Sequence, residues 1–260
     1  MSKTALITGA SGGIGYELAL LLARDGFDCI LVARSRDKLD ELAARLESEF
    51  RVKTLVVARD LSKPTAVDEI YEEVSAASMS IDVLVNNAGF PVYGRFVDTD
   101  LYTELGMLQV NVVALTALTK LFVRGMVERR NGRILNLAST AAFVPGPLMA
   151  VYYASKAYVL SFSQALANEL KGTGVTVTAL APGPTRTGFQ ERGSLEDARL
   201  VRGQIADAGS VALAGYRGLM AGKSVVIPGW GNKLLPVVVR LSPRTVITRV
   251  SRRLLEQAPH

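Results

Sequence analysis

The sequence predicts an α/β fold in which a parallel β-sheet of about seven strands carries helices on both faces. Short apolar runs alternate along the chain with longer segments of helical character, an order typical of parallel sheets. The apolar runs also lack polar–apolar alternation, as expected of strands that are covered on both faces. With 260 residues and 49% hydrophobic content, the chain suits a single domain over residues 1–260.

The elements are expected in a regular order. Strands are predicted at residues 4–8, 29–33, 52–58, 81–86, 133–138, 175–181 and 224–227. Helices are predicted at residues 14–23, 38–50, 104–129 and 152–170, and another opens at Ser62-Lys63-Pro64, with a cap-like Ser and a Pro in the first turn. In segment 38–50, Leu39, Leu42 and Leu46 recur at the spacing of one helix face.

Two segments depart from this alternation. Residues 188–222 are mixed and charged, contain several glycines and show no strong period, so they are interpreted as a mobile helical insert that forms a substrate loop. Residues 229–260 are expected to form a C-terminal helical extension. In its last part Val246, Ile247, Val250 and Leu254 share one helix face, and arginines lie on the other.

The net charge of +6 is concentrated in the tail. Residues 217–260 hold eight Lys or Arg and one acid, a net charge of +7, whereas the other residues hold 22 bases and 23 acids. This distribution does not indicate a nucleic-acid-binding protein. A basic amphipathic helix packs on its own domain, on a second subunit or on an anionic membrane surface. Packing on its own domain or on a second subunit is favoured here, and peripheral membrane contact is the alternative.

Cysteine and histidine usage argues against several classes of enzyme. The single cysteine, Cys29, excludes an internal disulfide, and the single histidine, His260, argues against Ser-His-Asp and Cys-His mechanisms. Neither a histidine-rich nor a cysteine-based metal site is expected, so no metal is predicted. The N-terminus lacks the apolar core of a signal peptide, and no run approaches the ~18 apolar residues of a membrane span. A cytoplasmic protein is therefore expected.

The segment Thr8-Gly9-Ala10-Ser11-Gly12-Gly13-Ile14-Gly15 follows the first strand and opens a helix. Glycines allow a tight turn and close approach of the backbone to a phosphate, and the helix N-terminus offers free N–H groups. The alternative is a structural glycine-rich turn. The strand–glycine–helix order favours a dinucleotide-binding Rossmann fold, a doubly wound parallel sheet. The cofactor contacts expected from this segment are Gly9, Ser11, Gly13, Ile14 and Gly15.

The residues after the second strand indicate which dinucleotide is bound. Rossmann enzymes that prefer NAD usually have an acid at this place, bonded to the ribose hydroxyls. Here the segment reads Val32-Ala33-Arg34-Ser35-Arg36. A guanidinium group fits a phosphate through two charge-assisted hydrogen bonds. NADP(H) is therefore predicted, with Arg34 as the main contact to the 2′-phosphate. The alternative is a solvated arginine at a strand end.

Tyr152 and Lys156 are four residues apart, so both side chains project from one face of the predicted helix. A nearby ammonium group favours the phenolate over the phenol, which brings proton transfer closer to neutral pH. The pair is therefore a candidate for general acid–base chemistry. A solvated helix face carrying the same two residues is the alternative.

With the glycine spacing TGxxxGxG, the Tyr152-xxx-Lys156 pattern resembles the short-chain dehydrogenase/reductase superfamily in its compact form. Its other landmarks follow in order: Asp60-Leu61 after the third strand, Asn86-Asn87-Ala88-Gly89 after the fourth, Asn111 in the long helix, Ser139, and Pro182-Gly183-Pro184-Thr185-Arg186-Thr187. The resemblance covers about residues 3–190. The tail is similar to that of bacterial reductases in the DltE-like branch.

The resemblance implies a catalytic set of Asn111, Ser139, Tyr152 and Lys156. Tyr152 would protonate a carbonyl oxygen as hydride arrives, and act as the base in reverse. Lys156 would lower the pKa of Tyr152 and hold the nicotinamide ribose, and Ser139 would stabilise negative charge on the substrate oxygen. Asn111 would hold a water that connects Lys156 to solvent. Further implied cofactor contacts are Asp60, Leu61, Asn87, Ala88, Gly89, Tyr152, Lys156, Pro182, Gly183, Thr185 and Thr187.

The function implied is that of an NADP(H)-dependent oxidoreductase acting on a carbonyl or secondary alcohol. The alternative is a non-catalytic NADP(H)-binding regulator that senses redox state. Fold analogy places residues 90–93, residues 141–149 and the insert from Phe189 around the substrate, and their apolar character favours an apolar small molecule. The resemblance also implies a homodimer or homotetramer that pairs through residues 104–129 and 157–170. Neither the substrate nor the physiological direction is defined by the sequence.

Overall fold

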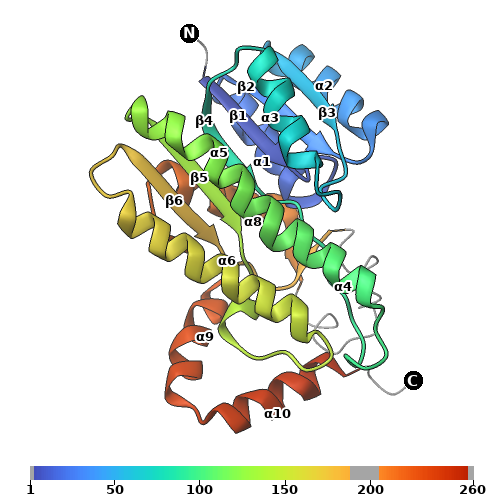
Figure 1. Ribbon diagram of the computed structural model, residues 1–260. Coiled ribbons are helices and arrows are strands. Elements are labelled where there is room, and N and C mark those ends of the chain that lie inside the picture. The colour runs from blue at the N-terminus through green and yellow to red at the C-terminus, as the bar shows by residue number, and fades with distance from the viewer. Residues whose placement is uncertain (1–2, 188–204, 257–260) are drawn as a thin grey trace.

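The computed structural model describes residues 3–187 and 205–256. Seven parallel strands form one sheet in the order β3-β2-β1-β4-β5-β6-β9 (Figure 1). The strands are β1 (Lys3–Thr8), β2 (Phe27–Ala33), β3 (Thr54–Ala58), β4 (Ile81–Asn86), β5 (Gly132–Leu137), β6 (Val175–Leu180) and β9 (Val225–Val226). The predicted doubly wound sheet is confirmed. Its order reverses between β1 and β4, the point at which ligands bind in such sheets.

Helices cover both faces of the sheet. On one face, α1 (Gly13–Arg24), α2 (Arg36–Phe50) and α8 (Ala208–Met220) bury Leu18, Leu42 and Val211 in one apolar cluster. On the other, α3 (Ala66–Ala76), α5 (Leu115–Glu128) and α6 (Ala150–Glu169) pack, with Ile70 and Leu118 in a second cluster. Burial of these apolar rows is the main stabilising contribution to the sheet.

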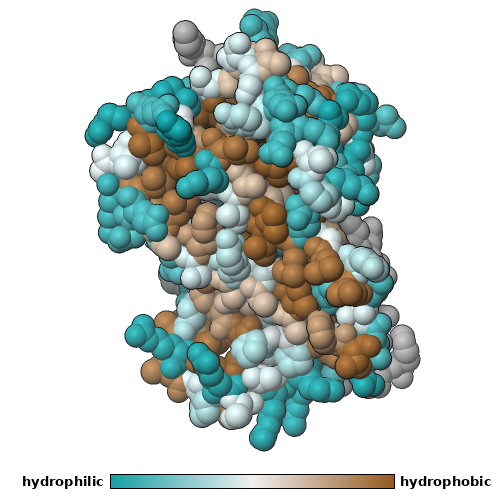
Figure 2. Space-filling view, viewed as in Figure 1, coloured by the Kyte–Doolittle hydropathy of each residue, from teal (hydrophilic) through white to brown (hydrophobic). Residues whose placement is uncertain are grey.

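The long helix predicted at residues 104–129 begins earlier and is interrupted. It consists of α4 (Leu101–Leu108), a π-helical turn η1 (Gln109–Ala114) and α5. The π-helical turn contains the buried Asn111, and such turns occur frequently at functional sites. Figure 2 shows hydrophobic side chains, in brown, along this helix on the molecular surface.

The same helix corrects one expectation from the sequence. Leu101–Glu128 is long and apolar enough to cross a membrane by length and composition, although the sequence analysis found no such run. Its inner face buries Leu118, Phe122 and Met126 against the sheet. A core helix of a globular fold therefore also accounts for this apolar segment.

The interpretation of residues 188–222 as a mobile helical insert is correct about a helix at 208–220 but wrong about an insert there. There α8 packs against α1 and the sheet as a regular crossover helix, with Val211 and Leu219 buried. Its pattern was missed because glycines replace bulky residues on the packing face: a Cβ at Gly215 or Gly218 would overlap the side chains of the strands below. Residues 188–204, including Phe189, lie outside the described residues.

Two shorter features complete the fold. β7 (Thr185–Arg186) pairs in parallel with β8 (Ala206–Asp207), which joins the nicotinamide segment expected from the sequence to the start of α8. The C-terminal extension forms α9 (Trp230–Leu241) and α10 (Arg244–Leu255), which lie together at one end of the molecule (Figure 1). α10 turns Ser251 and Leu255 inward, not the apolar row predicted from the sequence.

Candidate active site

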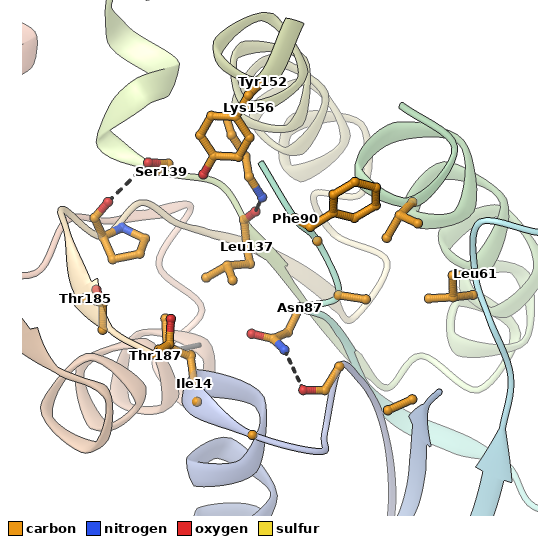
Figure 3. A pocket seen from close by; sticks show the side chains of 18 of the residues that line it. Ile14, Leu61, Asn87, Phe90, Leu137, Ser139, Tyr152, Lys156, Thr185 and Thr187 are labelled. Atoms are coloured by element: carbon orange, nitrogen blue, oxygen red, sulfur yellow. Dashed lines mark hydrogen bonds between the residues drawn. The ribbon is translucent and has the colours of Figure 1, made fainter. Parts of the chain in front are cut away.

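A cavity of about 610 Å³ opens at the carboxyl ends of the strands. It runs from the turn between β1 and α1 to the side chains of Ser139, Tyr152 and Lys156 (Figure 3). Every predicted site residue lines it except Gly15 and Asn111. Within the described part of the chain, no group of three or more His, Cys, Asp and Glu side chains is placed to hold a metal ion.

The glycine-rich turn has the conformation that its sequence predicts. Gly9 and Gly13 adopt φ angles of 68° and 57°, which favour glycine. Gly12 begins α1 without a side-chain cap, and the first turn of α1 contains no acid. The first N–H groups of this helix therefore face the cavity uncapped, in the form that suits a phosphate. A Cβ on Gly13 would lie 2.8 Å from Thr187 Cγ2, so the turn also contacts the opposite wall.

The loop after β4 fixes this turn in place. Asn87 Nδ2 donates to the carbonyl oxygens of Thr8 and Gly9 at 2.9 and 3.2 Å. Thr8 Oγ1 in turn accepts from the backbone N–H groups of Asn87 and Ala88, both at 3.0 Å. Gly15 lies outside the cavity because its role is packing: a Cβ there would overlap Asn87 Nδ2 and the Gly9 carbonyl.

Basic residues gather at the end of the cavity that follows β2 and β3. Arg34 is exposed there, as predicted, and Lys38 and Arg59 also line this end. Arg59 forms ion pairs with Glu69, at 2.7 Å, and with Glu73. Sequence reasoning missed Lys38, although its place in the first turn of α2, four residues after Arg34, is a usable signal. Asp60 and Leu61 complete this end of the cavity.

Tyr152 and Lys156 project from α6 into the other end of the cavity (Figure 3). Both are buried, with exposed fractions of 7% and 3%. Lys156 Nζ donates to the Leu137 carbonyl oxygen at 2.7 Å and lies 5.8 Å from the centre of the Tyr152 ring. The spacing argument is therefore correct in placing the two side chains together.

Burial governs the pKa values of this pair. It raises the pKa of the Tyr152 phenol above its usual value, and a hydrogen bond with Ser139 acts in the opposite direction. Burial lowers the pKa of Lys156 to about 8. Lys156 was expected to lower the pKa of Tyr152, but burial outweighs any such effect here, where the ammonium is turned toward Leu137. The phenol is protonated at neutral pH and is set to donate a proton.

Ser139 lies at the end of β5, opposite Tyr152. Its hydroxyl accepts from the Ala141 N–H at 3.1 Å and donates to the Pro182 carbonyl oxygen at 3.4 Å. The bond to Pro182 joins the loop after β5 to the segment 182–187, which the sequence analysis assigned to the nicotinamide. In that segment Thr185 Oγ1 donates to the Gly183 carbonyl oxygen at 2.9 Å. The structure thus brings the two loops to one wall of the cavity.

Asn111 lies behind the cavity wall. Its side-chain amide exchanges two hydrogen bonds of 3.1 Å with the backbone of Phe90 and donates to Ser155 Oγ at 3.3 Å. A Cβ at Gly89 would lie 2.9 Å from Asn111 Oδ1 and 3.6 Å from Lys156 Nζ, so Gly89 stands between them. Asn111 thereby holds the loop after β4 against α6. The water relay through Asn111 stays a prediction.

The sequence analysis missed part of the wall next to Tyr152. Tyr153 and Leu255 line the cavity there, together with Phe90 and Met149, which belong to the predicted segments 90–93 and 141–149. Leu255 is 1% exposed, and its carbonyl oxygen accepts from the Tyr93 hydroxyl at 2.8 Å. The end of α10 therefore closes this side of the cavity. The sequence signal for Leu255 was the apolar pair Leu254-Leu255 at the end of a helix. The sequence analysis placed only Leu254 on the apolar helix face.

The family model described as short chain dehydrogenase matches residues 3–197. The chain belongs to the short-chain dehydrogenase family. The very-long-chain 3-oxoacyl-CoA reductase of Bos taurus is 38% identical over 188 residues, which are 70% of this chain and 59% of that protein. This short-chain dehydrogenase thus spans about three fifths of the length of that relative.

Solved structures of the family are similar over nearly the whole chain. A short-chain dehydrogenase from Sphingobium yanoikuyae in complex with NADPH has a TM-score of 0.84 and 33% identity, with 92% of each chain covered. The bulky-bulky ketone specific alcohol dehydrogenase from Comamonas testosteroni has a TM-score of 0.78 and 32% identity, with 92% of this chain and 93% of that chain covered. The family whose model matches is one of dehydrogenases, which are oxidoreductases.

Proposed function

We propose that this short-chain dehydrogenase is an NADP(H)-dependent reductase of a carbonyl group on a bulky apolar molecule, or the NADP-dependent dehydrogenase of the matching secondary alcohol. One observation carries the proposal. The buried Tyr152 phenol is hydrogen-bonded to Ser139 and lies beside Lys156, at the end of the cavity that begins at the glycine-rich turn. A proton donor and a turn suited to binding a dinucleotide thus line the same cavity.

The residues present fit an NADP(H) cofactor. The uncapped N-terminus of α1, with no acid in its first turn, suits a pyrophosphate, and Arg34 and Lys38 suit the 2′-phosphate. Asp60 and Leu61 would border the adenine, and Asn87, Ala88 and Gly89 the ribose beyond it. Pro182, Gly183, Thr185 and Thr187 would hold the carboxamide. When bound, the nicotinamide supplies or accepts the hydride.

This chain's own residues handle the proton and the charge. Tyr152 donates its phenolic proton to the carbonyl oxygen, and takes a proton from the alcohol in the reverse direction. Ser139, whose hydroxyl already contacts the phenol, stabilises negative charge on the same oxygen. Lys156, buried between Tyr152 and Leu137, stabilises the phenolate that is left after donation. The 3% exposure of Lys156 keeps this charge out of bulk water.

The wall beside Tyr152 supports an apolar substrate. Phe90, Met149, Tyr153 and Leu255 line it, and a carbonyl with bulky apolar substituents would remove this surface from water. Two similar proteins agree with this in part, since one is an alcohol dehydrogenase specific for bulky-bulky ketones and the other is a very-long-chain 3-oxoacyl-CoA reductase.

A homodimer in the cytoplasm is part of the proposal. Leu101, Tyr102, Leu105 and Val113 are exposed on α4 and η1, and Tyr158 is exposed on α6, where it stacks on Phe162 at 5.8 Å. An isologous contact would bury this apolar face on two copies. Its support is the size of the exposed apolar surface along this helix (Figure 2).

A substrate screen tests the proposed reaction. Purified protein is mixed with NADPH and a panel of aryl ketones, steroid ketones, 3-oxoacyl thioesters and short aliphatic aldehydes, and loss of NADPH absorbance is followed. Turnover is expected with bulky apolar ketones, with NADPH preferred over NADH. Tight NADPH binding without turnover of any carbonyl or alcohol would contradict the proposal and favour a non-catalytic regulator.

A further inference from the structure

The two C-terminal helices present apolar rows to solvent. On α9 the exposed residues recur at the spacing of one helix face, and on α10 they recur once per turn. Trp230 and Leu241, at the two ends of the α9 row, are 84% and 81% exposed. These residues are named the tail face: Trp230, Leu234, Val237, Val238, Leu241, Val246, Val250 and Leu254.

Basic side chains border the tail face on both helices. Lys233 and Arg240 lie one turn from exposed apolar residues of α9, and Lys233 Nζ stands 4.6 Å from the centre of the Trp230 ring. Arg249 and Arg253 are exposed beside the row on α10. Figure 2 shows hydrophilic and hydrophobic residues next to one another at this end of the molecule. Apolar rows bordered by Lys and Arg are the pattern of helices that lie in a membrane interface.

The inner side of the same helices is already used by the fold. Ser251 hydrogen-bonds Tyr153, and Leu255 is buried and bonded to Tyr93. On α9, Asn232 approaches Gly183 so closely that a Cβ there would lie 2.8 Å from Asn232 Nδ2. The tail is thus attached next to the cavity by one side. The tail face is the opposite, solvent-exposed side of these two helices.

We propose that the tail face docks the protein on an anionic lipid bilayer. The net charge of residues 217–260 is +7, opposite in sign to such a surface, whereas the rest of the chain carries −1. A second copy fits this face less well, because an isologous contact would bring two tails of +7 together. Docking would place the apolar wall formed by Leu255 next to the bilayer that holds apolar molecules.

The single tryptophan of the chain, Trp230, lies on the tail face and reports on docking directly. The full-length protein is titrated with vesicles of phosphatidylcholine alone and of phosphatidylcholine with phosphatidylglycerol. With the anionic vesicles, Trp230 emission is expected to shift to shorter wavelength and the protein to co-sediment. With the neutral vesicles, binding is expected to be weaker by about tenfold or more.

Matched variants separate the tail from general charge effects. Arg240→Glu with Arg253→Glu should weaken binding to the anionic vesicles by about tenfold or more, because each basic residue near the surface adds to the attraction. The control pair Lys53→Glu with Lys171→Glu reverses the same number of exposed charges elsewhere and should bind like the wild type. A third variant, Leu234→Ser with Leu241→Ser, should lose the emission shift while keeping activity in solution.

Two outcomes would overturn the proposal. One is equal vesicle binding by the tail pair and the control pair. The other is that the wild-type protein does not bind vesicles and that the Leu234→Ser, Leu241→Ser variant forms a smaller oligomer than the wild type. This result would assign the tail face to a second copy. Because vesicle binding is measured without substrate, a failed carbonyl screen does not affect this test.

Discussion

Replacing Lys156 with methionine is expected to stabilise the cofactor-free protein at neutral pH and to lose that advantage in alkali. Lys156 is buried, with 3% of its surface exposed, and methionine matches much of its length without the charge. Within the described part of the chain, the ammonium donates one hydrogen bond, to the Leu137 carbonyl oxygen at 2.7 Å. A buried charge held so sparsely reduces the stability of the folded state.

The magnitude follows from the pKa of Lys156, which falls from 10.5 to about 8 on folding. Below pH 8 the ammonium is charged in both states, and burial costs the folded protein roughly 3 kcal/mol. As the pH rises from 8 to 10.5, the folded side chain gives up its proton and the penalty fades. Losing the bond to Leu137 costs the variant about 1 kcal/mol at every pH, which leaves a net gain of roughly 2 kcal/mol near neutrality.

Urea unfolding of the wild type and of Lys156→Met, each at about pH 7 and about pH 10, measures this effect. The difference in unfolding free energy between the two proteins should fall by roughly 2 to 3 kcal/mol across that range. Lys171→Met, at an exposed lysine, controls for loss of a lysine in general. A difference that stays constant with pH would refute the reasoning that burial dominates at Lys156.

Three further predictions concern the cofactor, the substrate wall and the sheet. Arg34→Ala should raise KM for NADPH by about tenfold or more, since it removes a charged hydrogen bond, and leave KM for NADH nearly unchanged in steady-state kinetics; equal effects on both cofactors would contradict the assignment. Leu255→Ala should raise KM for a bulky apolar ketone by about tenfold, while the neighbouring exposed Leu254→Ala should not. Gly218→Ala should destabilise the protein by about 2 kcal/mol in urea unfolding, because the new Cβ overlaps Val226. The control Gly106→Ala, where the new Cβ enters open space, should stabilise the protein slightly. Equal effects of the two changes would be inconsistent with close packing of α8.

Much of the fold could be predicted because the main strands contain short apolar runs, such as residues 5–7 in β1 and residues 83–85 in β4. The β1 and β4 strands, for example, are buried on both faces and match the predicted ranges within a residue. α8 could not be predicted in this way. Its buried face includes Gly215 and Gly218, and the absence of side chains there is what allows close approach to the sheet. A search for apolar residues at helical spacing does not detect a packing face that consists partly of glycines.

The site could be predicted where chemistry is tied to local spacing. The glycines of the first turn and the Tyr152–Lys156 pair lie within single turns, so sequence distance fixes their geometry. Contacts between distant segments could not be derived. Leu255 reaches the wall beside Tyr152 from the end of the chain, and Lys156 turns to the carbonyl of Leu137. The pKa direction at Tyr152 was missed for this reason, since burial depends on those distant segments.

The Tyr152→Phe variant tests the central claim most directly. The change removes one oxygen from a buried ring and keeps its packing on α6. Single-turnover measurement of NADPH oxidation with a ketone found in the screen should show hydride transfer slowed by about 10²-fold or more. NADPH affinity, measured by fluorescence titration, should stay within about twofold of the wild type. Hydride transfer at the wild-type rate in Tyr152→Phe would contradict the account.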